Sequence, residues 1–240
     1  MFVMNRFSRE EMLIGTDGML SLKNSHIAVF GIGGVGSFVC EALARAGVGK
    51  LTLIDNDTVS PTNINRQLVA LESTVGLLKT KVMKDRISDI NPEAEVFEIN
   101  DFYLPENAHL FPLENYTYIV DCIDTVSGKL SLIERADKAG INIISCMGTG
   151  NKLYGDRLKI SDIYKTSVCP LARVIRKGCK DRNIKSLKVC YSEEMPVKNE
   201  PTDEKTNSGR PVPGSVSFVP SVAGLLIAGE VVRDIISKTL

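Results

Sequence analysis

The chain has 240 residues, of which 43% are hydrophobic, and this is enough for the core of one large α/β domain. Its 29 basic and 29 acidic residues balance, so no global field points to a nucleic acid or a membrane, and any basic patch must be local. Six scattered cysteines without a signal peptide indicate reduced thiols, and no apolar run approaches the roughly twenty residues of a membrane-spanning helix. We therefore expect a single domain over residues 1–240, without a transmembrane segment, in the cytoplasm.

The first two thirds of the chain alternate between strand-like and helix-like stretches. Ser8 is placed to cap a short helix that Gly15 ends, and residues 26–37 predict a strand, a glycine loop and the start of a helix. Further strands are predicted at 51–55, 95–99, 116–124 and 141–146, and helices at 34–47, 75–90 and 126–139. This order predicts a Rossmann-like α/β fold, a mostly parallel sheet flanked by helices, with its ligand beyond the carboxyl ends of the strands.

The last third of the chain has a different character. Strand-like pieces at 157–161, 187–191 and 215–219 predict additional strands, and residues 171–182 form a basic helical stretch. Residues 193–214 are poor in apolar side chains and contain four prolines, so we expect a mobile loop at about these positions. A final buried helix is predicted at 222–236.

The strand that starts at residue 26 ends in a glycine-rich loop. Gly31, Gly33 and Gly36 have the spacing in which one glycine makes a turn, one lets the backbone approach phosphate, and one packs a helix on its strand. About twenty residues later, the next strand ends at Asp55, where a ribose hydroxyl is expected. Tight turns without a ligand also use such glycines, so the pattern depends on its context.

That context is an ordered series of motifs over residues 6 to about 150. It comprises Gly31-Ile32-Gly33-Gly34-Val35-Gly36, Asp55-Asn56-Asp57-Thr58-Val59, Asn63-Ile64-Asn65-Arg66-Gln67, Lys79 and Cys122-Ile123-Asp124. The series resembles the ubiquitin-activating-enzyme-like adenylating proteins, whose bacterial members include ThiF and MoeB. Within this family, it resembles the tRNA threonylcarbamoyladenosine dehydratase branch most closely, partly because of the pattern over residues 176–194.

The resemblance implies binding of ATP and Mg²⁺. Arg66 and Lys79 would grip the β- and γ-phosphates, which leave as pyrophosphate, and Asp124 would bind Mg²⁺. Asp57 is either part of the site or a turn residue. The other expected roles are ribose binding by Asp55, orientation of phosphate or substrate by Asn63 and Asn65, and further nucleotide contacts from Gly31, Gly33, Gly34, Gly36 and Gln67.

The implied reaction is dehydration of threonylcarbamoyladenosine beside the tRNA anticodon. The threonyl carboxylate would attack the α-phosphate of ATP, and the neighbouring carbamoyl group would then displace AMP and close a ring. One alternative is an adenylyltransferase that activates the C-terminal Gly-Gly of a sulfur-carrier protein, although the Cys-x-x-Cys pairs of the zinc-bearing relatives are missing here. A nucleotide-binding scaffold or a nicotinamide-dependent oxidoreductase is the other.

Partners are predicted from charge and from the resemblance. Seven cations lie within sixteen residues and form either a phosphate-backbone footprint for tRNA or a solvated helix face. They are Arg173, Arg176, Lys177, Lys180, Arg182, Lys185 and Lys188. The family resemblance further implies a homodimer in which Arg9 of one subunit reaches the ATP of the other, and it leaves a sulfur-relay partner open.

Overall fold

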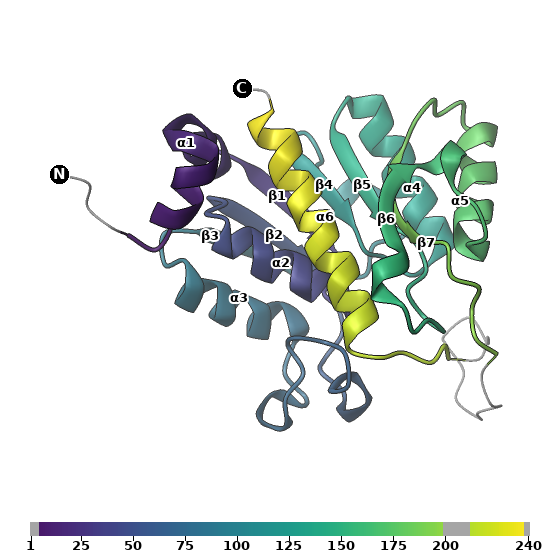
Figure 1. The fold of residues 1–240 in the computed structure, drawn as a ribbon, viewed down its shortest axis with the longest axis horizontal. Helices are drawn as coiled ribbons and strands as arrows, with labels where there is room; N and C mark the ends of the chain where they lie inside the picture. The colour runs from purple at the N-terminus through teal and green to yellow at the C-terminus, as the bar shows by residue number, and fades with distance from the viewer. Residues whose placement is uncertain (1–4, 199–211, 238–240) are drawn as a thin grey trace.

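The computed structural model describes residues 5–198 and 212–237, which form a seven-stranded sheet with helices on both faces (Figure 1). The strands are β1 (His26–Phe30), β2 (Lys50–Ile54), β3 (Glu95–Ile99), β4 (Tyr118–Asp121), β5 (Asn142–Cys146), β6 (Leu158–Asp162) and β7 (Lys188–Ser192). The helices are α1 (Ser8–Lys23), α2 (Gly36–Arg45), α3 (Lys79–Ile90), α4 (Val126–Ala139), α5 (Pro170–Asp181) and α6 (Phe218–Ile236).

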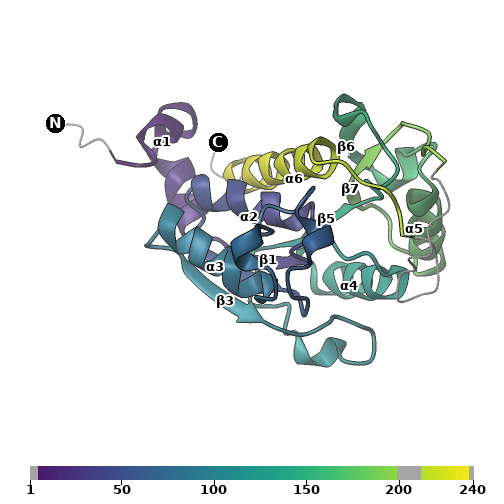
Figure 2. The ribbon, with the colours of Figure 1, turned by 90° about the horizontal axis from the view of Figure 1, so that it is seen from below.

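The strand order is β3-β2-β1-β4-β5-β7-β6. All neighbouring strands are parallel except β6, which pairs antiparallel with β7 at the edge of the sheet. The predicted mostly parallel α/β sheet is therefore confirmed. Parallel strands need crossover helices, and these cover both faces: α1, α2, α3 and α6 lie on one face, and α4 and α5 on the other (Figures 1 and 2).

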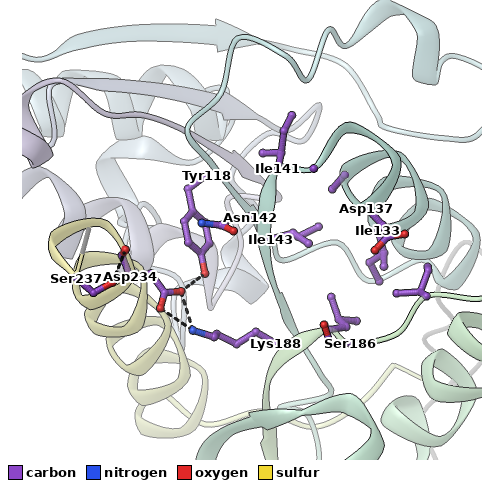
Figure 3. A pocket seen from close by; sticks show the side chains of 14 residues that line it. Tyr118, Ile133, Asp137, Ile141, Asn142, Ile143, Ser186, Lys188, Asp234 and Ser237 are labelled. Carbon is purple, nitrogen blue, oxygen red and sulfur yellow. Dashed lines mark hydrogen bonds and ion pairs between the residues drawn. The ribbon is translucent and has the colours of Figure 1, made fainter. Parts of the chain in front are cut away.

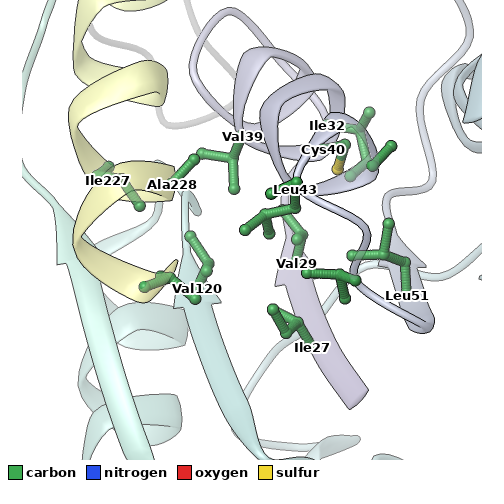
Figure 4. Close-up of a cluster of buried hydrophobic side chains, with 14 of the residues drawn as sticks. Ile27, Val29, Ile32, Val39, Cys40, Leu43, Leu51, Val120, Ile227 and Ala228 are labelled. Carbon is green, nitrogen blue, oxygen red and sulfur yellow. The ribbon is translucent and has the colours of Figure 1, made fainter. Parts of the chain in front are cut away.

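The main core lies between the sheet and the helix pair α2 and α6. Ile27 and Val29 of β1 point toward these helices, whereas Ala28 and Phe30 point to the opposite face, as the period of two in a strand requires. Figure 4 shows Val39 of α2 together with Ile27 and Val29 in this core. Each such fully buried aliphatic side chain contributes roughly 1.5–3 kcal/mol. This packing fixes α2, and with it the loop that enters α2, on the sheet.

The structure corrects the predicted cap of the first helix and the predicted start of the helix at 75–90. Ser8 does not cap the first helix, because its hydroxyl accepts a hydrogen bond from the Asn5 N–H at 2.7 Å and Phe7 occupies the capping position. Gly15 does interrupt the helix, with φ of 71°, but a second helical segment continues to Lys23. The helix predicted at 75–90 begins only at Lys79, because Gly76 adopts a left-handed conformation and Leu78 is extended.

The strand predicted at 215–219 is also wrong, since α6 begins at Phe218, four residues before the predicted start of that helix. Pro220 lies in the first turn of α6, where its missing N–H breaks no helical hydrogen bond. The predicted mobile loop at 193–214 falls mostly on residues 199–211, which lie outside the described residues. In the described ranges 5–198 and 212–237, no helix is long and apolar enough to cross a membrane.

Candidate functional site

The loop between β1 and α2 is built from glycines that leave no room for side chains. Gly31 has φ of 90°, and a Cβ on it would lie 2.8 Å from the Cys122 carbonyl oxygen. A Cβ on Gly36 would lie 1.8 Å from the Gly31 carbonyl oxygen. Both positions therefore require glycine. The close approach brings the β1–α2 loop against the turn that follows β4.

The middle of this loop is more open. A Cβ on Gly33 would meet only the Gln67 amide nitrogen, at 3.8 Å, whereas one on Gly34 would lie 3.2 Å from Pro220 Cβ and 3.5 Å from Arg66 Cγ. The amide oxygen of Gln67 is buried and has no hydrogen-bond partner among the described residues. A buried oxygen without a partner is costly, so its place beside the loop fits a polar ligand that donates to it.

Asp55 joins the glycine loop to the end of β2. One carboxylate oxygen accepts from the Ile32 N–H at 2.6 Å, and the other accepts from the Asp57 N–H at 2.8 Å. Burial raises the pKa of Asp55, and the nearby Lys79 charge opposes that rise. Each oxygen keeps a second lone pair. The carboxylate can therefore hold the loop and still accept a ribose hydroxyl.

Lys79 is the first residue of α3 and lies beside this carboxylate loop. Its ammonium is buried and lies 2.6 Å from the Asp57 carboxylate, and its backbone N–H donates to the Asp57 carbonyl at 3.1 Å. The structure thus gives Asp57 a role that turn propensity did not predict, because it is the ion-pair partner of Lys79.

Arg66 is a cation without a carboxylate partner among the residues that the structure describes. Its guanidinium donates to the Thr62 carbonyl at 2.8 Å and to the Asn65 side-chain oxygen at 3.0 Å. Partial burial lowers the pKa of Arg66, but a guanidinium stays charged in proteins. Its alkyl stem lies against Gly34, so an uncompensated positive charge stands at the glycine loop.

The two asparagines of this segment make contacts within the protein. The Asn63 side-chain oxygen accepts from the Ser60 N–H at 3.1 Å and holds the short turn Pro61–Asn63. The Asn65 amide donates to the Ser215 carbonyl at 3.0 Å, which ties the segment to the approach to α6. Both side chains therefore position the segment that carries Arg66, and their expected role in orienting phosphate stays a prediction.

Asp124 lies in the turn between β4 and α4. It follows Cys122 and Ile123, the two residues that Gly31 approaches closely. Its side chain is exposed, and within the described ranges its carboxylate makes no hydrogen bond or ion pair. Mg²⁺ is commonly held by one or two carboxylates together with phosphate oxygens and water. A single free carboxylate beside a phosphate loop fits that requirement.

Known proteins are similar to this chain over most of its length, including the residues described above. Residues 7–239 match the model of the ThiF family. The chain belongs to the ThiF family. It is 44% identical over 243 residues to the tRNA threonylcarbamoyladenosine dehydratase of Bacillus subtilis, with 98% of this chain and 96% of that protein covered. It is 41% identical over 175 residues to the protein of the same name from Escherichia coli, with 73% of this chain and 65% of that protein covered.

Solved structures agree with this family. The chain is similar to the crystal structure of the E. coli tRNA N6-threonylcarbamoyladenosine dehydratase, TcdA, in complex with ATP, with a TM-score of 0.87 and 32% identity. That match covers 98% of this chain and 95% of the other. The complex of the same E. coli protein with AMP gives a TM-score of 0.88 at 31% identity. The predicted family resemblance is confirmed.

Below the site, this ThiF-family chain contains a buried ion pair that our sequence analysis missed. The Lys129 ammonium of α4 lies 3.0 Å and 2.9 Å from the two oxygens of Asp121, and neither side chain is exposed. The same carboxylate accepts from the Ser145 hydroxyl and from the Ile123 N–H, the latter at 3.0 Å. These bonds fix the turn that presents Asp124. In the sequence, the only sign of this pair is that Asp121 lies near the end of a predicted strand and Lys129 lies eight residues later, in the predicted helix.

The cysteines of this ThiF-family site are poor nucleophiles. All six cysteines of the chain lie in its described part and are free thiols. Burial raises the pKa of Cys122 well above its usual value and raises that of Cys146 to about 12. Because the thiolate is the reactive form, neither side chain is activated at neutral pH. The described ranges also contain no cluster of three or more His, Cys, Asp or Glu that could hold a metal.

Two features of the fold lie away from the glycine loop. Arg9 is exposed on α1, which precedes the amino end of β1, so a single chain does not bring Arg9 to the carboxyl ends of the strands (Figure 1). A pocket of about 480 Å³ lies at the opposite, amino edge of β4, β5 and β7. Figure 3 shows that Asp234 bonds both Tyr118 and Lys188 there, each at 2.7 Å, so these polar groups join α6 to the sheet.

Proposed function

We propose that this chain is an ATP-dependent tRNA threonylcarbamoyladenosine dehydratase. The observation that carries the proposal is the arrangement of two cations and one free carboxylate around the glycine loop. Arg66 and Lys79 supply the positive charge, and Asp124 supplies the carboxylate. The near full-length similarity to the Bacillus subtilis protein supports the same substrate.

The first step is adenylation. An oxygen of the threonyl carboxylate attacks the α-phosphorus of ATP, and the bond from that phosphorus to the bridging oxygen of the β-phosphate breaks. The two leaving phosphates depart as pyrophosphate with the bonding electrons. Arg66 and Lys79 stabilise the charge that builds on them, since preorganised donors cost no reorganisation at the moment of reaction. Mg²⁺ held by Asp124 would neutralise further phosphate charge.

The second step closes the ring. A nitrogen or oxygen of the carbamoyl group attacks the activated carbonyl carbon and expels AMP, and a carbamoyl nitrogen loses a proton in either case. The oxygen of the eliminated water leaves on AMP, so the substrate loses one water for each ATP cleaved. Because the nucleophile belongs to the same nucleoside, its effective molarity is high. This step needs no cysteine, in agreement with the raised pKa of the Cys122 and Cys146 thiols beside the loop.

A homodimer completes the proposal. Met12, Leu13 and Leu20 of α1 are 70%, 87% and 55% exposed, and such apolar exposure is typical of an interaction surface. An α1–mediated dimer would give Arg9 a route to the partner subunit's nucleotide. A cytoplasmic location follows from the tRNA substrate within this proposal, and a sulfur-relay partner stays an expectation from the family resemblance.

The deciding experiment follows the nucleoside itself. The protein is incubated with ATP, Mg²⁺ and tRNA that carries threonylcarbamoyladenosine, and the digested nucleosides are analysed by mass. We expect loss of one water from the modified adenosine, with one AMP and one pyrophosphate formed for each. An unchanged nucleoside, together with adenylation of a sulfur-carrier protein ending in Gly-Gly, would contradict the proposal and support the alternative.

A further inference from the structure

The surface over α5 and the turn after it carries several exposed cations against a single exposed carboxylate, that of Asp181. Arg173, Lys177, Lys180 and Lys185 are exposed, and none of the four forms an ion pair with another described residue. Four lysines elsewhere on the surface are compensated by carboxylates, whereas Lys165 and Lys198 also lack an ion-pair partner among the described residues. Lys23, Lys50, Lys84 and Lys138 lie 3.2, 2.9, 2.8 and 2.6 Å from carboxylates. The four unpaired side chains are called the α5 basic face below.

Helix α5 presents three of these side chains as one row. Ala172, Ile175 and Cys179 are buried, and Arg173, Lys177 and Lys180 follow at intervals of four and three residues on the exposed side. At a rise of 1.5 Å for each residue, the row is about 10 Å long. The helix is held tightly, because a Cβ on Gly178 would lie 2.5 Å from the Leu130 side chain of α4. The charges therefore stand on a rigid support.

The end of the row borders a hollow. A pocket of about 200 Å³ is lined by Tyr164, Lys180, Asn183, Ile184 and Lys185. Its wall is fixed, because the Tyr164 hydroxyl donates to the Ile184 carbonyl and Asn183 reverses the chain with φ of 58°. Two lysines in the lining of one concave site suit an anion of the size of a phosphate.

The neighbouring cations have other partners, which corrects the seven-residue footprint predicted from sequence. Arg176 donates to the Thr166 carbonyl at 2.9 Å and to its hydroxyl at 2.6 Å. Arg182 pairs with Glu134 at 3.0 Å. Lys188 pairs with Glu230 and Asp234, at 2.7 Å each. Carboxylates neutralise Arg182 and Lys188. Arg176 keeps its charge, but its guanidinium is held at Thr166.

We propose that the α5 basic face binds the phosphate backbone of the tRNA, with one phosphate in the hollow between Lys180 and Lys185. This inference rests on the proposed function, which makes tRNA the substrate. The face offers flexible ammonium groups and one guanidinium, and Val174 is its exposed apolar neighbour on α5. Such a surface matches a regular series of negative charges better than the apolar centre of a protein partner.

A matched pair of double variants tests the proposal. Lys180→Ala/Lys185→Ala removes two charges from the basic face, and Lys23→Ala/Lys50→Ala removes two charges from surface ion pairs elsewhere. Binding of an unmodified transcript of a tRNA whose natural form carries threonylcarbamoyladenosine is measured over a series of salt concentrations. Each lost phosphate contact lowers the slope of log K against log salt by about 0.7–0.9, and both lysines hold one phosphate, so we expect a loss of about 0.8 in the first variant. We expect the wild-type slope in the second.

A further variant, Arg173→Ala/Lys177→Ala, tests the rest of the row and is expected to show an equal or larger loss of slope, because its two side chains contact separate phosphates. ATP binding should be unchanged in all three variants. A wild-type slope in Lys180→Ala/Lys185→Ala, or an equal loss in the Lys23→Ala/Lys50→Ala control, would overturn the proposal. So would loss of binding to phosphatidylserine vesicles in the basic-face variants with tRNA binding intact.

The test does not depend on catalysis. Failure of the proposed function would show as wild-type protein that leaves threonylcarbamoyladenosine unchanged. Failure of this inference would show as active wild-type protein whose basic-face variants bind tRNA normally.

Discussion

The Lys79 ammonium lies 2.6 Å from the Asp57 carboxylate, although the Lys79 side chain is 6% exposed and that of Asp57 is 61% exposed. The buried partner is the cation, and the solvated partner is the carboxylate. The solvent-exposed Asp57 carboxylate therefore holds the buried Lys79 ammonium in place. Triphosphate oxygens that enter the loop would meet a preoriented ammonium.

Removal of either cation should slow turnover. We expect Lys79→Ala and Arg66→Ala each to reduce turnover about 10²–10³-fold, because each would supply a preorganised charge to the departing pyrophosphate. Pyrophosphate release at saturating tRNA measures the effect. The control is Lys81→Ala, since Lys81 is two residues away, exposed and paired with Asp85. Near-normal turnover in both site variants would contradict the roles given to these residues.

Mixed dimers should show whether Arg9 acts across subunits. Arg9→Ala subunits and Lys79→Ala subunits are each expected to be weakly active when alone. If Arg9 serves the partner's nucleotide, one site of a mixed dimer regains both residues, and activity partly returns. The measurement is turnover after subunit exchange, with exchange followed by tagged subunits. No recovery after proven exchange would count against sharing.

The buried pair below the site should matter for folding. Lys129→Ala leaves the Asp121 carboxylate buried without its ammonium, which typically costs about 3–5 kcal/mol of unfolding free energy. Lys138→Ala on the same helix breaks only an exposed pair with Glu134 and should cost about 0–1 kcal/mol. Urea denaturation of both variants measures the difference. Equal stability losses would refute a special role for the buried pair.

His26 should make stability depend on pH. Burial and the nearby Lys50 charge lower the pKa of His26 below its usual 6.5, and its ring nitrogen lies 2.8 Å from the Thr52 hydroxyl. The unfolded chain therefore binds more protons than the folded one as pH falls below about 6.5, so stability should decrease from pH 7.5 to about 5.5. His26→Gln should flatten this part of the urea-midpoint curve.

The control for that curve is His109→Gln, which changes the other histidine of the chain and should keep the wild-type pH dependence. A variant at position 26 with an undiminished slope would show that another group titrates in this range.

The sequence by itself determined the order of strands and helices and the glycine loop. These features are local: a strand buries side chains with a period of two, a helix with a period near 3.6, and Gly31 is required by the conformation of its own backbone. Helix α4 was predicted over its full range of 126–139 because Gly140 ends it in a left-handed conformation. The strand predicted at 215–219 is wrong because a short apolar run fits both the strand period of two and the helix period near 3.6.

Only the tertiary structure decided which charges are paired. Lys79 and Asp57 are 22 residues apart, and Lys188 and Asp234 are 46 apart, yet the sheet brings each pair within hydrogen-bond distance. Arg176 instead bonds the neutral Thr166, in the turn before α5. From sequence, all seven cations of residues 173–188 are equivalent. Folding distinguishes them, because the energy of an ion pair depends on the distance and burial of two groups that the backbone alone brings together.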